Sequence, residues 1–345
     1  MENELSINRY HVTLDNQSLM AGDSNRILLE SLNVVVSYGF IADIHSNHVA
    51  LKVAIEILQN LGVDGMFCAG DVVGYGCGPN EAIGLLKKYK IRSILGNHDF
   101  FLMEEAYLKG LTTNWPNIPE FRAIGENRIH FSPVGMETLD WNLVMVSKAN
   151  LKWLGSLPIL GTVNNSEVSM IHGSPSLSSR TPPVKIEDYF YSLVNYLHPW
   201  NKDTIALHSK LVPSPTLVVG HTHMQHAQQT FHGTAANASL IYPCLMNFDD
   251  FPVSKVFQGP SPLIVNPGSA GLSRDNIQAP GICTISFTGK KRKKVTWLRF
   301  TYDFDEYQDL LIKRGAPRKV LEIDFWRIDS ELKGLHYSVI QKEAV

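Results

Sequence analysis

Three short apolar runs, separated by stretches with helical spacing, constrain the fold of this chain most strongly. The runs cover residues 34–42, 66–69 and 91–95, and the helix-like stretches between them cover 50–61 and 80–88. The order strand–helix–strand–helix–strand is the pattern of parallel strands joined by right-handed crossovers. The sequence therefore predicts an α/β fold with a parallel sheet in this part of the chain.

A polar residue follows each of these three runs at its carboxyl end. The residues are Asp43, Asp71 and Asn97. Ligands of open α/β sheets bind outside the carboxyl ends of the strands. We therefore expect these three side chains to lie close together, although they are far apart in the sequence.

Two later apolar runs end in histidine. Residues 168–171 lead to His172, and residues 216–219 lead to His221 and His223. Side chains repeat every two residues along a strand, so His221 and His223 are expected on the same side of an extended strand end. The equally spaced pair Asp43 and His45 carries the same expectation.

Together these positions supply enough oxygen and nitrogen donors for two adjacent divalent metal ions. The predicted ligands are Asp43, His45, Asp71, Asn97, His172, His221 and His223. A single aspartate after a strand is more often a helix cap or turn former, and a single histidine is more often a hydrogen-bonded residue. Five such signals in one order favour a metal site, and this mixture of donors suits Mn, Fe, Zn, Ni or Co better than Ca or Mg alone.

This donor set predicts hydrolysis of a phosphate ester. Two ions about 3.5–4 Å apart would bind a phosphoryl group, and a hydroxide bridging them would attack phosphorus in line. The leaving oxygen then needs a proton. His98, next to Asn97, is the predicted general acid, and Asp99 is predicted to fix its tautomer by accepting the other ring N–H.

Three further residues are candidates for contacts with substrate. Tyr75 lies in a Gly-Tyr-Gly turn near Asp71, and Arg180 and Arg274 could bind phosphate oxygens through two parallel hydrogen bonds. A solvated surface arginine is the commoner alternative. The aromatic residues within 189–200 are most simply core residues, with a base-stacking surface as the less common alternative.

Composition excludes several other classes of protein. Hydrophobic residues make up 44% of the 345 residues, and the formal net charge is −2, which argues against a surface that coats nucleic acid. The basic run at residues 290–294 lies between two β-like stretches, 282–287 and 295–300, and is expected to be the solvated tip of a hairpin rather than an anion-binding patch.

The cysteines and the N-terminus indicate a cytoplasmic protein. The four cysteines include no C-x-x-C pair, which disfavours a zinc finger or a disulfide scaffold. The first residues have no basic region followed by an apolar stretch, so no secretory signal is predicted. No apolar run reaches the roughly 18 residues that a membrane span needs.

The remaining stretches are less regular. Residues 100–160 are predicted to be mostly helical and amphipathic, and residues 306–314 form a predicted helix that Gly315 ends. Residues 174–212 read as an insertion with aromatic helical content, and residues 227–261 give no clear prediction.

The motifs, taken in order, resemble those of the calcineurin-like metallophosphoesterase superfamily. They are Asp43-Ile44-His45, Gly70-Asp71, Gly96-Asn97-His98-Asp99, His172-Gly173 and Gly220-His221-Thr222-His223. The surrounding residues, such as Gly74-Tyr75-Gly76 and Asn266-Pro267-Gly268-Ser269, are closer to its small prokaryotic branch of phosphodiesterases and diadenosine tetraphosphatase-like proteins.

The resemblance implies a four-layer α/β/β/α sandwich, in which helices flank two mostly mixed β-sheets, with a dinuclear metal site. One ion would be bound by Asp43, His45, Asp71 and His223. The other would be bound by Asp71, Asn97, His172 and His221. His98 would be the general acid, and a homodimer is expected.

The same resemblance sets the expected domain boundaries. The metallophosphoesterase domain would span residues 34–325, with insertions at about 176–215 and 227–262. An N-terminal extension, 1–33, would precede it, and a tail, 326–345, would follow it.

The predicted function is metal-dependent hydrolysis of a phosphodiester or a nucleotide pyrophosphate, with a small phosphorylated substrate such as a nucleotide. One alternative is a phosphomonoesterase, including a protein Ser/Thr phosphatase. Another is a non-catalytic, metal-stabilised scaffold for a protein partner, which would be expected to have a broken ligand set, whereas all five motifs are intact here.

Overall fold

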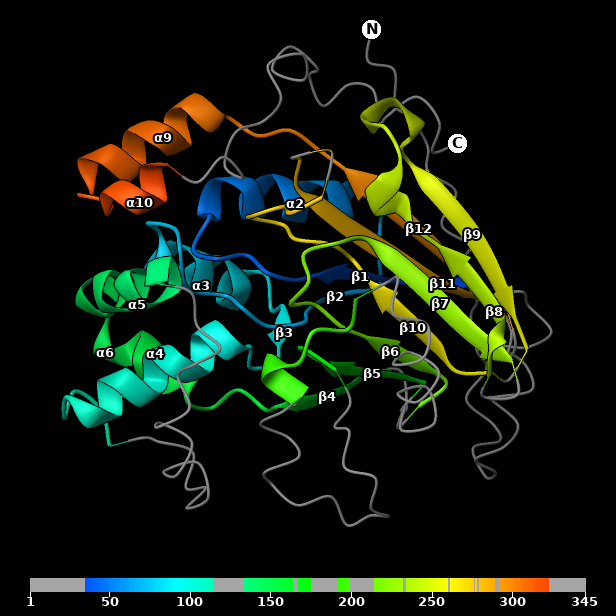
Figure 1. Cartoon of the computed structure of the whole chain (residues 1–345), viewed down its shortest axis with the longest axis horizontal. Helices are drawn as coiled ribbons and strands as arrows, with labels where there is room; N and C mark the ends of the chain where they lie inside the picture. Colours follow the sequence, from blue (N-terminus) through cyan, green and yellow to red (C-terminus); the bar gives the residue numbers. More distant parts are fainter. Residues whose placement is uncertain are drawn as a thin grey trace, which may run out of the picture.

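The fold consists of two mixed β-sheets that pack face to face and are flanked by helices (Figure 1). This arrangement confirms the predicted fold class. The computed structural model describes residues 35–113, 133–163, 167–174, 192–198, 214–231, 234–259, 261–275, 277, 279–288 and 292–322. The predicted N-terminal extension, the C-terminal tail and most of the 176–215 insertion lie outside the described residues, as does Arg180.

The first sheet contains the predicted parallel run. Its strand order is β3-β2-β1-β11-β12-β9. The bounds are β3 Arg92–Ser93, β2 Gly65–Cys68, β1 Val35–Ile41, β11 Gly281–Thr288, β12 Arg292–Arg299 and β9 Val253–Gln258. Strands β1, β2 and β3 are parallel, whereas β11, β12 and β9 are antiparallel to their neighbours. The predicted hairpin is confirmed, with Ile282 of β11 paired to Leu298 of β12.

The second sheet repeats this mixed arrangement. Its strand order is β4-β5-β6-β10-β7-β8. The bounds are β4 Leu160–Val163, β5 Val168–Ile171, β6 Thr216–Val218, β10 Leu263–Asn266, β7 His226–Phe231 and β8 Thr234–Ile241. Strands β5, β6 and β10 are parallel, and the other pairs are antiparallel. The stretch 227–261, which gave no clear prediction, thus supplies β8 and β9, one edge strand of each sheet, and most of β7.

The core between the sheets follows from the alternation of side chains along the strands. Phe40 of β1 points into the layer between the sheets, while the next residue, Ile41, packs against the helices. Both faces of β1 are therefore apolar, as expected for a strand covered on two sides. Trp297 is fully buried in the central layer, and its Nε1 donates to the Asn266 carbonyl at 3.0 Å, which joins β12 of one sheet to β10 of the other.

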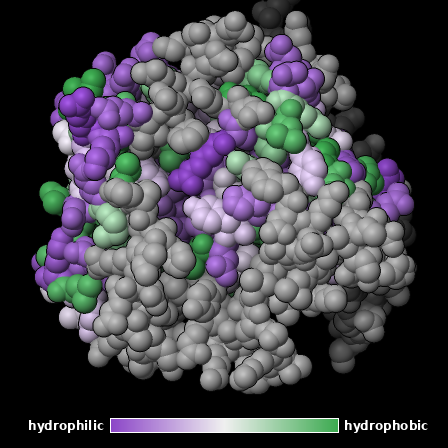
Figure 2. Space-filling view, in the orientation of Figure 1, coloured by the Kyte–Doolittle hydropathy of each residue, from purple (hydrophilic) through white to green (hydrophobic). Residues whose placement is uncertain are grey.

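Helices cover the outer face of the first sheet and carry the second hydrophobic core. The helices are α2 His48–Asn60, α3 Pro79–Lys88, α4 Asn97–Leu108, α5 Pro133–Met145, α6 Lys148–Leu154, α9 Phe304–Lys313 and α10 Arg318–Leu321. Two short 3-10 helices, Pro243–Leu245 and Phe248–Asp250, follow β8. Hydrophilic side chains predominate over the outward surface of α5, α9 and α10 on the face seen in Figure 2.

The helix boundaries follow local capping chemistry. Asn47 Oδ1 accepts a hydrogen bond from Ala50 N at 3.1 Å, so α2 begins at His48. Asp303 Oδ1 accepts from Glu306 N at 2.8 Å and starts α9. Gly315 follows this helix with φ of +67°, a left-handed conformation that ends it as predicted.

Two of the expectations for individual segments are wrong. The first half of α4 is buried on all sides rather than along one stripe, because α4 lies between the strand ends and the helices α5 and α6. The basic run is exposed at Arg292 and Lys294, as expected for the end of a hairpin, but the expectation is wrong for Lys293, which is buried in β12. The Lys293 side chain is only 3% exposed, and its Nζ donates to the Pro215 carbonyl at 3.1 Å.

No helix in the described part of the chain has the length and apolar character needed to cross a membrane. The four cysteines, Cys68, Cys77, Cys244 and Cys283, are buried free thiols.

Candidate metal centre

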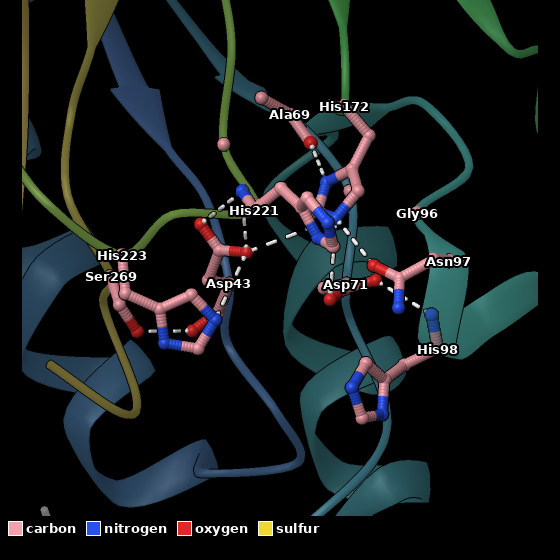
Figure 3. A network of polar contacts seen from close by, with 12 residues as sticks. Asp43, Ala69, Asp71, Gly96, Asn97, His98, His172, His221, His223 and Ser269 are labelled. Carbon is pink, nitrogen blue, oxygen red and sulfur yellow. Dashed lines mark hydrogen bonds and ion pairs between the residues drawn. The ribbon is translucent and has the colours of Figure 1, made fainter. Parts of the chain in front are cut away.

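The predicted ligands come together where strands of the two sheets end (Figure 3). In the first sheet, Asp43 and His45 follow β1, and Asp71 follows β2. In the second sheet, His172 follows β5, and His221 and His223 follow β6. The convergence expected from the parallel strands is observed, and both sheets contribute to one buried cluster.

The local conformation at this cluster differs from the predicted extended strand ends. Asp43, His45, Asp71, His221 and His223 have φ values of 53°, 49°, 54°, 65° and 63°. These left-handed conformations lie beyond the last residues of β1, β2 and β6, so strand alternation is not what brings the paired side chains together. Non-glycine residues rarely adopt this conformation, and they cluster at functional sites where the surroundings enforce it.

Backbone hydrogen bonds between the loops enforce these conformations. His45 N donates to the Asp71 carbonyl at 3.0 Å, and Asp43 N donates to the Gly70 carbonyl at 3.1 Å. His221 N donates to both carboxylate oxygens of Asp43, at 3.0 and 3.1 Å. The loops after β1, β2 and β6 therefore hold one another in place.

The donor atoms fall into two groups that share Asp71. The first group is Asp43, His45, Asp71 and His223, and the second is Asp71, His172 and His221. Within each group the ligand atoms lie within 4.8 Å of one another. Asn97 Oδ1 lies 3.0 Å from His172 Nε2, so the amide oxygen adjoins the second group.

Backbone carbonyls orient three of the four imidazole rings. His172 Nδ1 lies 2.8 Å from the Ala69 carbonyl oxygen, and His223 Nδ1 lies 2.5 Å from that of Leu272. His221 Nε2 lies 3.1 Å from the Val194 carbonyl oxygen. In each of these rings the other nitrogen is left available as a ligand atom of the cluster. This pattern is typical of histidines that bind metals, because the second hydrogen bond fixes the ring and its tautomer.

Burial and neighbouring charges perturb the pKa values throughout the cluster. Burial lowers the pKa of His45 and of His223 well below the usual value, so both rings are neutral at pH 7, and their Nε2 atoms lie 3.0 Å apart. Burial raises the pKa of Asp43 to about 7, and Asp71 adds to this rise.

Asp71 and His172 form the charged pair of the cluster. Burial alone would raise the pKa of Asp71, but the positive charge of His172 holds it well below the usual value. Burial opposes the charge on His172, yet Asp71 outweighs it and raises the pKa of His172 to about 9. Two buried carboxylates and four imidazoles this close to one another form a donor set that fits divalent cations, which would displace the proton of His172 on binding.

A close contact between Asp71 and the start of α4 explains why the residue before Asn97 is a glycine. His98 N donates to Asp71 Oδ1 at 2.8 Å, so the amino end of α4 stabilises the shared carboxylate. A Cβ atom at Gly96 would lie 2.1 Å from the same oxygen. No side chain fits here, because Asp71 approaches the backbone too closely.

Asp99 bonds to the backbone around this contact. Its Oδ2 accepts from Gly96 N at 3.0 Å and from Val72 N at 3.2 Å, and its Oδ1 accepts from Val73 N at 3.0 Å. These three hydrogen bonds join the loop after Asp71 to the start of α4.

His98, Tyr75 and Arg274 line one side of the cluster. The His98 ring centroid lies 4.7 Å from that of His45 and 4.7 Å from that of Tyr75. Arg274 Nη2 donates to the Tyr75 hydroxyl at 3.3 Å. Burial lowers the pKa of His98 to about 4, so its imidazole is neutral at pH 7.

Sequence reasoning did not single out two residues at this site. Tyr196 is expected in the core but is 44% exposed, and its ring lies 3.9 Å from that of His221, nearly parallel to it. Asn142 of α5 accepts from Ser46 Oγ at 2.8 Å and donates to the Gly76 carbonyl at 3.0 Å. No motif marks either residue, because their roles depend on contacts with loops far away in the sequence.

Comparison with known proteins agrees with this fold and cluster. Residues 36–249 match the calcineurin-like phosphoesterase family, and this span is more than half of the chain. The chain therefore belongs to the calcineurin-like phosphoesterase family, which confirms the resemblance found in its motifs.

One sequence relative is an uncharacterized protein of Methanocaldococcus jannaschii, which is 25% identical over 277 residues, 80% of this chain and 92% of the relative. A metallophosphoesterase from Sphaerobacter thermophilus has a similar structure, with a TM-score of 0.59 and 23% identity over 84% of this chain and 97% of that one. A hypothetical protein from Pyrococcus horikoshii has a TM-score of 0.53 and 16% identity, with the same coverage of 84% and 97%. These two similarities show that the fold is shared.

Proposed function

We propose that this protein is a dinuclear metal-dependent phosphoesterase that hydrolyses phosphodiesters or nucleotide pyrophosphates. One observation carries the proposal. Two buried donor groups share the carboxylate of Asp71, and all their ligand atoms lie within 4.8 Å of one another in each group. Membership of the calcineurin-like phosphoesterase family supports the reaction class.

The proposed ligands of the first ion are Asp43, His45, Asp71 and His223. Those of the second ion are Asp71, Asn97, His172 and His221. Divalent ions bound there would supply Lewis acids for the phosphoryl oxygens and would lower the pKa of the water that serves as nucleophile. The mixed oxygen and imidazole donors favour Mn, Fe, Zn, Ni or Co.

His98 is proposed to act on the leaving group. Its pKa of about 4 leaves a neutral imidazole at pH 7, which can donate a hydrogen bond from one ring N–H to the oxygen that leaves phosphorus. The hydrogen bonds of Asp99 support a positioning role, since they join the loop after Asp71 to the start of α4. The tautomer-fixing role expected for Asp99 stays a prediction.

Arg274 and Tyr75 are proposed to contact the substrate. The Arg274 guanidinium lies 5.8 Å from the centre of the Tyr75 ring, which itself lies 4.9 Å from the His45 ring. A guanidinium in this position can bind phosphoryl oxygens through paired hydrogen bonds. Together with Tyr196, Tyr75 adds aromatic surface beside the donors, which favours an ester with an organic group on both sides of phosphorus over a bare monoester.

Hydrolysis of bis-p-nitrophenyl phosphate with added Mn²⁺ tests the proposal, with p-nitrophenyl phosphate as the monoester comparison. We expect faster turnover of the diester and loss of that turnover in Asp71→Ala. The proposal fails if Asp71→Ala hydrolyses the diester at the wild-type rate. Faster turnover of the monoester would instead support the phosphomonoesterase alternative.

Elemental analysis of the purified protein separates the enzyme from the non-catalytic scaffold. Two equivalents of metal per chain with turnover are expected for the enzyme, whereas a scaffold would bind metal and leave every phosphoester intact. The homodimer and the cytoplasmic location stay predictions.

A further inference from the structure

A buried arginine at the end of β12 binds the loop that follows the Asn266-Pro267-Gly268-Ser269 segment. Arg299 Nη1 donates to the Ala279 carbonyl at 2.6 Å and to Ser273 Oγ at 3.2 Å, and Nη2 pairs with Asp275. Ser273 Oγ in turn donates to Asp275 Oδ1 at 2.8 Å. Arg299 is 1% exposed, and Asp275 is 8% exposed.

This loop touches the donor cluster at two points. The Leu272 carbonyl accepts from His223 Nδ1 at 2.5 Å, and Arg274 donates to the Tyr75 hydroxyl at 3.3 Å. Leu272 directly precedes Ser273, and Arg274 lies between Ser273 and Asp275. The residues that bind Arg299 therefore alternate with the residues that contact the site.

A role in overall stability explains this arrangement poorly. Removing two charges from water costs several kcal/mol, and a buried ion pair is often no more stabilising than apolar residues of similar size. The pair does, however, impose a single geometry on the loop, because the guanidinium is planar and contacts the loop at Ser273, Asp275 and Ala279. That geometry fixes where the Leu272 carbonyl points.

We propose that the Arg299–Asp275 pair is a positioning device for the metal ion bound by His223 and for Arg274. The pair holds the Leu272 carbonyl, which orients the His223 ring toward Asp43, and it holds Arg274 beside Tyr75. The proposal rests on the proposed function, because it assumes that His223 binds an ion of the dinuclear site.

Calorimetric titration of the metal-depleted full chain with Mn²⁺ tests this positioning role without relying on catalytic turnover. The variant is the double substitution Arg299→Met with Asp275→Leu, which removes both charges and keeps the volume apolar. We expect a melting temperature close to the wild-type value. We expect one of the two ions to bind about 10- to 100-fold more weakly and the other to bind unchanged. The KM for bis-p-nitrophenyl phosphate should also rise, because Arg274 is no longer held.

Lys293→Met is the matched control. Lys293 lies on the same strand, is 3% exposed and donates to the Pro215 carbonyl at 3.1 Å, but it is at the far end of β12 from the cluster. Both Mn²⁺ affinities should match the wild type in this variant.

Two results would overturn the positioning role. The first is that the double variant binds both ions with wild-type affinity. The second is that the binding of both ions weakens to the same extent in the double variant and in Lys293→Met. Asp275→Asn keeps the shape of the side chain, so it provides the same comparison if the double variant does not fold. Wild-type protein that binds fewer than two ions would instead contradict the proposed function itself.

Discussion

At the scale of single residues, His98 is the clearest candidate for a group that acts on the substrate. Its ring packs against His45 and Tyr75, and its pKa of about 4 keeps it neutral. In His98→Ala we expect turnover of a dinucleotide, which has a poor leaving group, to fall by about 10²–10³-fold, because the N–H donor to the leaving oxygen is lost. Turnover of bis-p-nitrophenyl phosphate should fall much less, because p-nitrophenolate is a weak base whose negative charge needs little stabilisation from a ring N–H.

The kcat values of the two substrates, measured at saturating Mn²⁺, check this prediction. The variant should keep the wild-type metal content, since the backbone N–H of residue 98, which donates to the shared carboxylate, is retained. Equal losses on both substrates would argue against a role at the leaving group.

Protonation of Asp43 and His172 should make metal binding depend on pH. The pKa values of about 7 and about 9 mean that both groups carry a proton at pH 6, whereas mainly His172 does at pH 8. Metal binding displaces these protons, so affinity should rise with pH. We expect about two protons to be released per loaded chain at pH 6 and about one at pH 8.

Calorimetric titration with Mn²⁺ in two buffers of different ionisation enthalpy measures that proton release. The Lys293→Met variant should show the same release as the wild type, because Lys293 is remote from the cluster. An affinity that does not change between pH 6 and pH 8 would contradict the prediction.

The residues of the donor cluster were predictable from sequence because each follows an apolar run or lies within a compact motif. Their conformations were not. The φ values of +53° at Asp43 and +65° at His221 arise from hydrogen bonds between loops that are far apart in the sequence. Tyr196 and Asn142 escaped prediction for the same reason, since only the folded chain brings them to the site.

At the scale of single elements, the start of α4 depends on the absence of a side chain. In Gly96→Ala the added Cβ would lie 2.1 Å from Asp71 Oδ1. Asp71 or the helix must then move, so we expect a loss of about 1–3 kcal/mol in the free energy of unfolding. Binding of both ions should weaken, because Asp71 belongs to both donor groups.

Gly84→Ala is the control for that substitution. Gly84 lies in α3, and no atom is within 4 Å of the position that a Cβ would take. This variant should gain about 0.5–1 kcal/mol from the lower flexibility of the unfolded chain and should bind Mn²⁺ normally. Urea denaturation and Mn²⁺ titration of both variants check the pair. Normal metal binding in Gly96→Ala would show that the close contact is not needed.

Helices and strands were predictable from the sequence where their apolar residues recur at one clear spacing. The strands β1 and β2 and the helices α2 and α3 meet this condition, and so does the hairpin of β11 and β12. Strand β7 does not, because His226, Gln228 and Gln229 are all buried in it. Polar residues on both faces remove the alternation that marks a strand, which explains why residues 227–261 gave no clear prediction.

At the scale of the whole molecule, the donor cluster joins the two sheets. Asp43, His45 and Asp71 come from the first sheet, whereas His172, His221 and His223 come from the second. An ion bound by His45 and His223 therefore connects β1 to β6 across the interface. Such an ion binds the folded chain and not the unfolded one, so it should stabilise the entire fold by mass action.

We therefore expect Mn²⁺ to raise the melting temperature of the metal-depleted protein by several degrees, and EDTA to reverse the rise. At a free concentration of 100 times Kd, each ion should add about 2.7 kcal/mol to the free energy of unfolding. Differential scanning fluorimetry over a range of Mn²⁺ concentrations measures the shift. The response should disappear in Asp71→Asn, which removes the charge that both donor groups share. A shift of the same size in Asp71→Asn would mean that Mn²⁺ stabilises the protein elsewhere, and that the two sheets are not joined through this cluster.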